Sequence, residues 1–211
     1  MVSYKRETIR YPHYITSNMV KSVCVYSASS SQIHDKYFDA AYRLGKVLGQ
    51  AGITCVNGGS NKGLMKVVSH STMEHGGKAV GVIPSFMIDE GWENRELNEL
   101  IITDSMHERK ETMAKLADAV VALPGGCGTL EELLEIITWK QLGLFVNPVI
   151  ILNFDGFYNP LIGMLDKAVS ENFMREVHRE MFTVVDKPED VLTAIKNARR
   201  WSETPRKFAA I

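Results

Sequence analysis

Short apolar runs recur along the chain and alternate with segments in which apolar residues have helical spacing. Several of these runs are apolar throughout, without the alternation that a half-exposed strand would show. This is typical of strands covered on both faces of a sheet. We therefore predict seven strands, at residues 23–26, 53–56, 79–83, 100–103, 119–123, 149–152 and 182–185.

Two of the intervening segments have the period of an amphipathic helix. The apolar positions are 38, 41, 44 and 48 in residues 35–51, and 130, 133, 134 and 137 in residues 129–144. Strands that alternate with helices form βαβ crossovers, which place the strands in parallel. The pattern thus predicts an α/β fold, a doubly wound Rossmann-like parallel sheet of about seven strands with helices on both faces.

No linker, charge run or internal repeat divides the chain, and a length of 211 residues suits one core better than two. We predict a single Rossmann-like domain at residues 20–196. An N-terminal arm at residues 1–19 precedes it, and a basic C-terminal tail at residues 197–211 follows it.

Composition argues against several classes of partner. With 24 Lys and Arg against 25 Asp and Glu, the net charge of −1 disfavours a broad basic face for nucleic acid. No run approaches the ~18 apolar residues of a membrane span, and the first twenty residues lack the apolar stretch of a signal peptide. The three cysteines are far apart and, like the histidines, lack metal-ligand spacing, so we expect a cytoplasmic protein with no metal or cofactor. The ten methionines are interpreted as core filler rather than as a binding surface.

Three turns rich in small residues follow predicted strands, at residues 27–31, 57–63 and 124–129. In an open α/β sheet the ligand sits beyond the carboxyl ends of the strands, so these turns are candidate binding segments. The first, SASSS, is consistent with contacts to a base or ribose and equally with a helix N-cap. The second contains Gly58 and Gly59, which either present backbone donors to the ligand or merely make a tight turn.

The third turn, PGGCGT, gives the strongest signal. Gly125, Gly126 and Gly128 let the backbone pass close to a ligand. Thr129 then opens a helix, whose free N–H groups favour an anion such as phosphate. The alternative is that Thr129 and Glu132 form a capping box, which would only stabilise the start of the helix.

The motifs narrow the kind of nucleotide. Neither glycine turn supplies the GxxxxGK[ST] of a Walker A loop. A dinucleotide-binding GxGxxG would begin at Gly126 but end at Glu131, whose carboxylate repels a pyrophosphate. A single phosphate at the helix start remains, as a nucleoside monophosphate would supply. Cys127 has no histidine partner at a recognisable spacing, so thiol catalysis is disfavoured.

Upstream of this turn, the segment MHERK at residues 106–110 begins a helix. Adjacent helical residues point in different directions, so we expect that Arg109 and Lys110 do not both face the core. One alternative is that they are a solvated pair on the helix surface. The other is that they belong to the anion site, because an arginine holds a carboxylate or phosphate with two parallel hydrogen bonds.

MHERK, followed by PGGCGTLEE and by ITWKQLG at residues 137–143, resembles the LONELY GUY (LOG) family of cytokinin riboside 5′-monophosphate phosphoribohydrolases. The similarity runs from about Val23 to Ala194 and includes CVYSASS, GGSNKGLM and LNFDGFY. It implies hydrolysis of the N-glycosidic bond between a base and ribose 5-phosphate, and a homodimer with helices packed across an interface beside the site. The family's historical label, lysine decarboxylase, has no support, since no pattern marks a lysine as a pyridoxal phosphate Schiff base.

Carried over by motif, the resemblance implies that Arg109 and Glu132 are the catalytic pair. The substrate-binding residues that it implies are Gly58, Gly59, Lys110, Gly125, Gly126, Gly128, Thr129, Glu131 and Thr138. Two departures concern the base preference. Asn57 and Ser60 stand where the family usually has an aromatic residue and a glycine, at positions where nucleotide contacts are expected.

The hypothesis is therefore a nucleoside 5′-monophosphate phosphoribohydrolase that acts on a cytokinin riboside 5′-monophosphate or on AMP. Cleavage passes through an oxocarbenium-like sugar, which a carboxylate such as Glu132 stabilises while it activates water. One alternative is the same chemistry on purine and pyrimidine nucleotides in general, in salvage. Another is a sensor module that binds a nucleotide without turnover.

Overall fold

The seven predicted strands form one sheet in which every pairing is parallel, in a computed structural model that describes residues 20–199 and 201. The strands are β1 Ser22–Tyr26, β2 Thr54–Asn57, β3 Lys78–Pro84, β4 Glu99–Thr103, β5 Ala119–Ala122, β6 Val149–Leu152 and β7 Thr183–Val185. Each starts and ends within one residue of its predicted position. The expected N-terminal arm at residues 1–19, and the expected tail apart from residues 197–199 and 201, lie outside the described residues.

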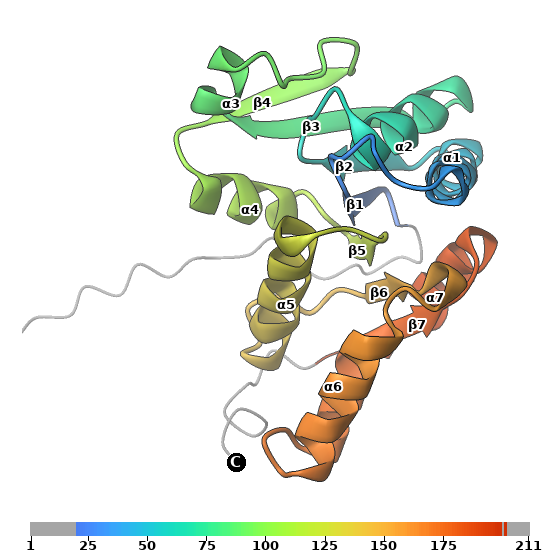
Figure 1. The fold of residues 1–211 in the computed structure, drawn as a ribbon, viewed down its shortest axis with the longest axis vertical. Helices are drawn as coiled ribbons and strands as arrows, with labels where there is room; N and C mark the ends of the chain where they lie inside the picture. The colour runs from blue at the N-terminus through green and yellow to red at the C-terminus, as the bar shows by residue number, and fades with distance from the viewer. Residues whose placement is uncertain (1–19, 200, 202–211) are drawn as a thin grey trace, which may run out of the picture.

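Helices cover both faces of this sheet, as predicted (Figure 1). The helices are α1 Asp35–Gln50, α2 Gly63–Glu74, α3 Ser85–Asp89, α4 Met106–Lys115, α5 Cys127–Gln141, α6 Asn159–Ser170 and α7 Val191–Asn197, with short 3₁₀ turns η1 Phe154–Gly156, η2 Glu176–Met181 and η3 Pro188–Asp190. No helix in this described part of the chain is long and apolar enough to cross a membrane.

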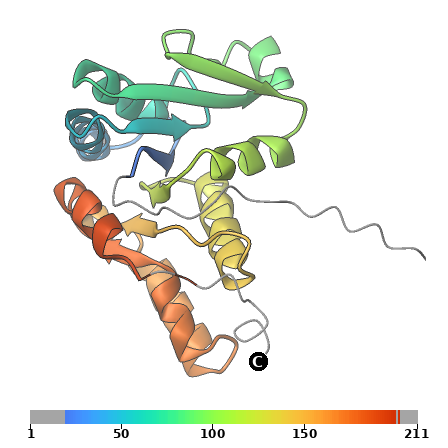
Figure 2. The ribbon, with the colours of Figure 1, turned by 180° about the vertical axis from the view of Figure 1, so that it is seen from behind.

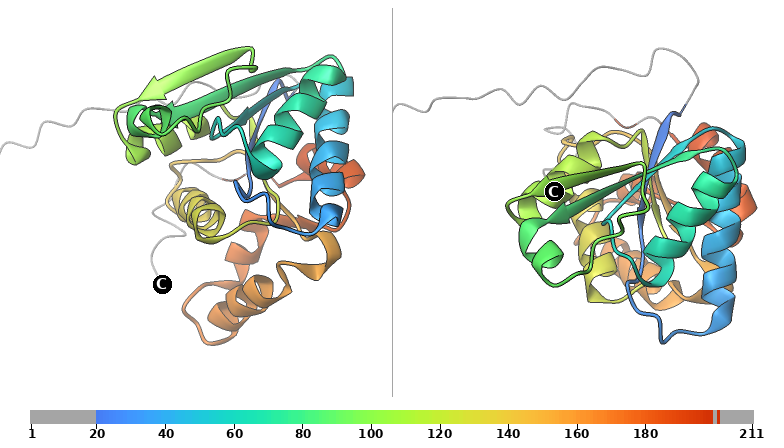
Figure 3. Two further views of the ribbon diagram at one scale, coloured as in Figure 1. Left: turned by 45° about the horizontal axis from the view of Figure 1, so that its top comes forward. Right: turned by 90° about the horizontal axis from the view of Figure 1, so that it is seen from above.

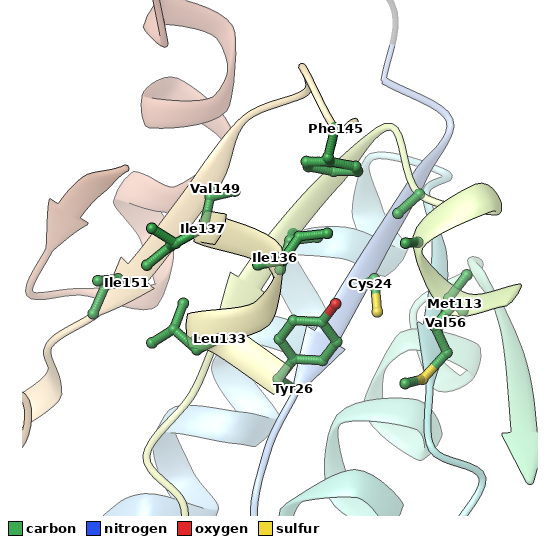
Figure 4. Packing of buried hydrophobic residues seen from close by; sticks show 14 of the residues in the cluster. Cys24, Tyr26, Val56, Met113, Leu133, Ile136, Ile137, Phe145, Val149 and Ile151 are labelled. Atoms are coloured by element: carbon green, nitrogen blue, oxygen red, sulfur yellow. The ribbon is translucent and has the colours of Figure 1, made fainter. Parts of the chain in front are cut away.

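Alternate side chains of the central strands build two separate cores, one on each face of the sheet. Figure 3 shows the helices that cover the two faces. Val23 and Val25 of β1 pack with α1, α2 and α7. Cys24 and Tyr26 point the other way and pack with Met113 of α4 and with α5 (Figure 4). Because both faces are buried, the strands have the apolar runs without alternation from which they were predicted.

In the strand order β4-β3-β2-β1-β5-β6-β7 the direction of building reverses at β1, in the middle of the sheet. The chain builds outward from β1 to β4 and then returns through α4 to β5 on the other side of β1. Figure 2 shows the result, with α3 and β4 at one end of the molecule and α6 at the other. Ligands bind at such a reversal, beyond the carboxyl ends of the strands. The three small-residue turns follow β1, β2 and β5, and thus lie at this edge.

The starts of two helices decide the capping alternatives, and one of them differs from its predicted position. Helix α5 begins at Cys127 rather than at Thr129, and its N-cap is Gly126, which makes no side-chain capping bond. Thr129 and Glu132 therefore lie inside the helix, and the capping-box interpretation is wrong. The cap of α1 is His34, whose ring accepts from the Lys36 N–H, so the SASSS turn does not cap that helix.

Candidate active site

The carboxyl ends of β1, β2 and β5 border a cavity of about 640 Å³. This volume falls within the roughly 300–1,000 Å³ of small-molecule sites. The lining residues are Ser27, Ala28, Ser29, Ser30, Gly58, Ser60, Asn61, Lys62, Met65, Ile83, Met87, Trp92, Met106, Arg109, Gly126, Cys127, Gly128, Thr129, Glu131 and Glu132. All three small-residue turns contribute to it, together with the first turn of α4 and the first two turns of α5.

Arg109 is fixed on one wall of this cavity by backbone carbonyls. Its Nε donates to the Val82 carbonyl at 3.0 Å, and its Nη2 donates to the Gly58 carbonyl at 3.3 Å. A Cβ on Gly58 would lie 1.7 Å from Nη2, so the guanidinium occupies the space where a side chain would stand. Gly58 is thus required by Arg109 and not by the turn alone.

Glu132 faces Arg109 from α5. Its Oε1 lies 3.6 Å from the Arg109 Nη1, and its side chain is almost entirely buried. Burial raises the pKa of Glu132 to about 7, against the lowering effect of the Arg109 charge. A carboxyl group that titrates near neutral pH is suited to accept a proton during a reaction.

The glycines of the PGGCGT turn have two different roles. A Cβ on Gly125 would lie 2.1 Å from the Thr129 Oγ1, so Gly125 makes room for that side chain. A Cβ on Gly126 or Gly128 would meet no described atom within 4 Å, and both residues line the cavity. Protein packing therefore explains Gly125, whereas Gly126 and Gly128 leave bare backbone at a helix N-terminus for a ligand to approach.

Arg109 and Lys110 are both buried, with 6% and 7% of their surface exposed, so the expectation that they would not both face the interior is wrong. The reason is that α4 is enclosed from two directions. Arg109 points toward β3 and the β2 turn, whereas Lys110 points toward α5 and pairs there with Glu131 and Glu135. Lys110 does not line the cavity.

Three further residues from the motif comparison also lie off the cavity lining. Gly59 is buried in the β2 turn with a positive φ, and Gly125 lies under Thr129. Thr138 is exposed about three turns along α5, and its hydroxyl donates to the Leu134 carbonyl. Its role stays a prediction.

Asn57 does not face the cavity, although nucleotide contacts were expected at this position. Its amide donates to the Met65 carbonyl and to the Ser69 hydroxyl, and its Oδ1 accepts from the Gly59 N–H. The side chain therefore holds the β2 turn to α2. Ser60 does line the cavity.

An apolar part of the cavity was missed in the sequence. It consists of Met65, Ile83, Met87, Trp92 and Met106. The interpretation of the methionines as core filler is therefore wrong for three of them. Met65 closes the GGSNKGLM segment and Met106 opens MHERK, and these two motifs were the available signals; Ile83, Met87 and Trp92 come from segments without a motif of their own.

No group of three or more His, Cys, Asp or Glu side chains within residues 20–199 and 201 is arranged to hold a metal ion.

The comparisons with known proteins agree with the motifs. Residues 65–195 match a family model described as "possible lysine decarboxylase". A rice (Oryza sativa subsp. japonica) protein named "probable cytokinin riboside 5′-monophosphate phosphoribohydrolase LOG4" is 42% identical over 179 residues, which are 85% of this chain and 78% of that protein. The chain belongs to the LOG family.

Two other LOG proteins show the extent of the similarity. Cytokinin riboside 5′-monophosphate phosphoribohydrolase LOG of rice is 47% identical over 161 residues, and the match covers 76% of this chain and 66% of that relative. Arabidopsis thaliana LOG5, with the same enzyme name, is 44% identical over 168 residues, which are 80% of this chain and 74% of LOG5.

Solved structures agree on the LOG fold at lower identity. The molybdenum cofactor binding protein of Rippkaea orientalis superposes with a TM-score of 0.64 at 23% identity, over 85% of this chain and 98% of that one. The molybdenum cofactor carrier protein of Chlamydomonas reinhardtii gives a TM-score of 0.63 at 20% identity, over 84% and 97%. These similarities establish the Rossmann-like fold and nothing about the ligand.

Proposed function

We propose that this LOG protein hydrolyses the N-glycosidic bond of a nucleoside 5′-monophosphate and releases the free base and ribose 5-phosphate. The relatives named above carry this activity in their names. The observation that carries the proposal is the buried Arg109–Glu132 pair, which lines the same cavity as the bare glycine backbone at the start of α5.

The phosphate is placed at the start of α5. There the unpaired N–H groups of the first turn and the helix dipole favour an anion, and Gly126 and Gly128 let it approach. Binding energy from this remote group fixes the sugar for attack, so losing the phosphate should slow the reaction as well as weaken binding.

Glu132 is assigned the chemistry at the sugar. As the C1′–N bond breaks, its electron pair leaves with the base, which takes up a proton from solvent, and positive charge develops at C1′. The Glu132 carboxylate stabilises that charge and takes a proton from the water that adds to C1′. Arg109 holds Glu132 in place. Since the carboxylate is the active form and burial raises its pKa to about 7, activity should rise with pH through neutrality.

The apolar part of the cavity is assigned to the base. Met65, Met87, Met106 and Trp92 offer a flexible, polarisable surface that accepts a planar ring. Such a surface fits adenine and also an adenine with an apolar substituent, so both AMP and a cytokinin riboside 5′-monophosphate are candidate substrates.

The test measures free base by chromatography after incubation of the purified protein with AMP, with isopentenyladenosine monophosphate and with UMP. Base from either adenine nucleotide supports the proposal, and base from AMP alone rejects cytokinin activation. Turnover of UMP at a similar rate favours the general nucleotide nucleosidase. No base from any monophosphate overturns the enzyme and leaves the sensor.

One variant and one control test the catalytic role of Glu132. Glu132→Gln should lose at least 100-fold in kcat while still binding AMP, in line with the loss of a general base. Glu111→Gln on α4 is the control, because Glu111 pairs with Lys115 at the surface, away from the cavity. Full activity of Glu132→Gln would show that Glu132 has no role in catalysis.

We further propose that the protein forms a homodimer or higher homo-oligomer through α5. Leu134, Leu142 and Leu144 are each about 40% exposed, and Leu134 and Leu142 share one face of the helix with Thr138. Light scattering after gel filtration should show a dimer, and Leu134→Glu with Leu142→Glu should shift it to monomer; a wild-type monomer contradicts this.

All three cysteines are free, which supports a reducing compartment such as the cytoplasm.

A further inference from the structure

Lys110 is a buried cation that the proposed chemistry does not use. Its side chain is 8% exposed, and its Nζ pairs with a carboxylate oxygen of Glu131 and, at 3.1 Å, with Glu135. Burial tends to lower the pKa of Lys110, but the hydrogen bonds to Glu131 and Glu135 outweigh it and raise that pKa. Lys110 therefore carries its charge at any physiological pH.

The two partners of Lys110 flank Glu132 on α5. Glu131 precedes it directly, Glu135 follows three residues later, and both are more solvated than Glu132 itself. Three carboxylates within five residues of a helix repel one another. Without a cation, the cheapest way to relieve that repulsion is to protonate the most buried of the three, which is Glu132.

We propose that Lys110 is a positioning residue that keeps Glu132 in its carboxylate form by neutralising Glu131 and Glu135, and that it does not contact the substrate. Its absence from the cavity lining agrees with this role. The proposal rests on the function proposed above only for its kinetic readout.

The groups that face Glu132 come from three elements. Arg109 and Lys110 of α4 lower its pKa, Glu131 and Glu135 of α5 raise it, and Cys24 and Tyr26 of β1 are buried beneath it. Burial raises the pKa values of the Cys24 thiol and the Tyr26 hydroxyl well above their usual range, so both stay neutral. The charge balance at Glu132 is therefore set by the two cations and the two neighbouring carboxylates.

The experiment is a pH profile of kcat/KM for AMP. Lys110→Met keeps the aliphatic stem and removes the charge, and it should move the acid limb upward by about 0.5–1 pH unit. At a pH below this acid limb, kcat/KM should fall roughly threefold to tenfold. At a pH above it, KM should stay near the wild-type value. Lys110→Arg should restore the wild-type limb.

The decisive variant is Lys110→Met combined with Glu131→Gln and Glu135→Gln. It has no unpaired carboxylates beside Glu132, so the acid limb should return toward the wild-type position. If Lys110 instead binds phosphate, Lys110→Met raises KM at every pH and the triple variant does not recover. That result, or an unmoved limb in Lys110→Met, overturns the proposal.

A readout without turnover separates this claim from the proposed function. Titration of ¹³C-labelled glutamate by NMR, with Glu132 assigned from Glu132→Gln, should show the same upward displacement in Lys110→Met. Displacement without any turnover would reject the enzyme and keep the role of Lys110. Turnover without a displaced Glu132 titration would keep the enzyme and reject the role of Lys110. Melting curves of each variant confirm that it is folded.

Discussion

The two glycine turns at the mouth of the cavity differ in what fills the space beside their backbones. At the β2 turn, Gly58 gives its side-chain space to the Arg109 guanidinium. At the β5 turn, Gly126 and Gly128 face open space within 4 Å. A protein side chain fills the space at the first turn, whereas the space at the second turn is left open for a ligand.

This difference shows that a glycine motif alone does not locate a ligand. Both turns follow a strand, precede a helix and contain paired glycines, and both were candidate binding segments by that criterion. The position of a neighbouring side chain separates them. Substitutions at the two turns should therefore affect turnover and substrate binding differently.

Gly58→Ala should cost more than 100-fold in kcat/KM. The new methyl group would lie 1.7 Å from the Arg109 Nη2, so the guanidinium must move, and a displacement of about 1 Å at a catalytic group can cost ~10²-fold. Gly126→Ala at the open turn is the matched comparison and should affect KM more than kcat. Near wild-type turnover in Gly58→Ala would mean that the position of Arg109 is not critical.

Glu132→Gln should gain stability over the wild type as the pH rises. The difference in free energy of unfolding between variant and wild type should be about 1–3 kcal/mol larger at pH 8 than at pH 5. Burial raises the folded-state pKa of Glu132 to about 7 from a usual 4.5. Below pH 4.5 the group is protonated in both states and has no effect. Between pH 4.5 and 7 the unfolded state releases the proton first, so the wild type loses stability as pH rises, and above 7 the loss is constant. Denaturant melts at the two pH values measure the difference; equal differences would contradict the raised pKa.

Gly128→Ala should raise stability while it weakens substrate binding about tenfold. Gly128 lies in the first turn of α5 without a positive φ, and alanine is favoured over glycine in a helix by about 0.5–1 kcal/mol. The same methyl group would stand where the phosphate is expected. Thermal melts and isothermal titration with AMP check the two effects. Unchanged affinity would place the phosphate elsewhere.

Tyr158→Phe should lower the melting temperature by about 2–4 °C, which corresponds to ~1 kcal/mol in a chain of this size. Its buried hydroxyl donates to the Leu123 carbonyl at 2.7 Å, directly before the β5 turn. The loss would leave that carbonyl without this donor under the open turn. Tyr42→Phe at an exposed position is the control. A melting temperature equal to that of the control would show that the turn does not depend on Tyr158.

The sheet could be predicted almost fully from sequence, since burial of both faces imposes apolar runs that local reading detects. The start of α5 could not, because Thr129 and Glu132 have the spacing of a capping box while the true cap, Gly126, has no side chain to signal it. The arginine and glutamate of the site were found through motifs, not through any local property.

Other parts of the site depend on contacts between distant segments. The burial of both Arg109 and Lys110 arises because β3 and α5 enclose α4 from two sides. Asn57 was expected at the nucleotide because its position in the turn is visible in sequence, but its hydrogen bonds to Met65 and Ser69 are not. Sequence spacing gives the position of a residue along the chain and not the direction of its side chain.

The pairing of β1 with β5 bears on when the protein becomes competent during synthesis. Val23 pairs with Ala119, so the central strand stays half-paired until more than half of the chain has been made. Contacts of such sequence separation form slowly and leave an exposed strand edge in the meantime. A ribosome-bound chain that ends before β5 has Arg109 but neither Glu132 nor the glycine start of α5. Such nascent chains should therefore neither bind nor cleave a nucleotide, and they present the β1 edge to chaperones.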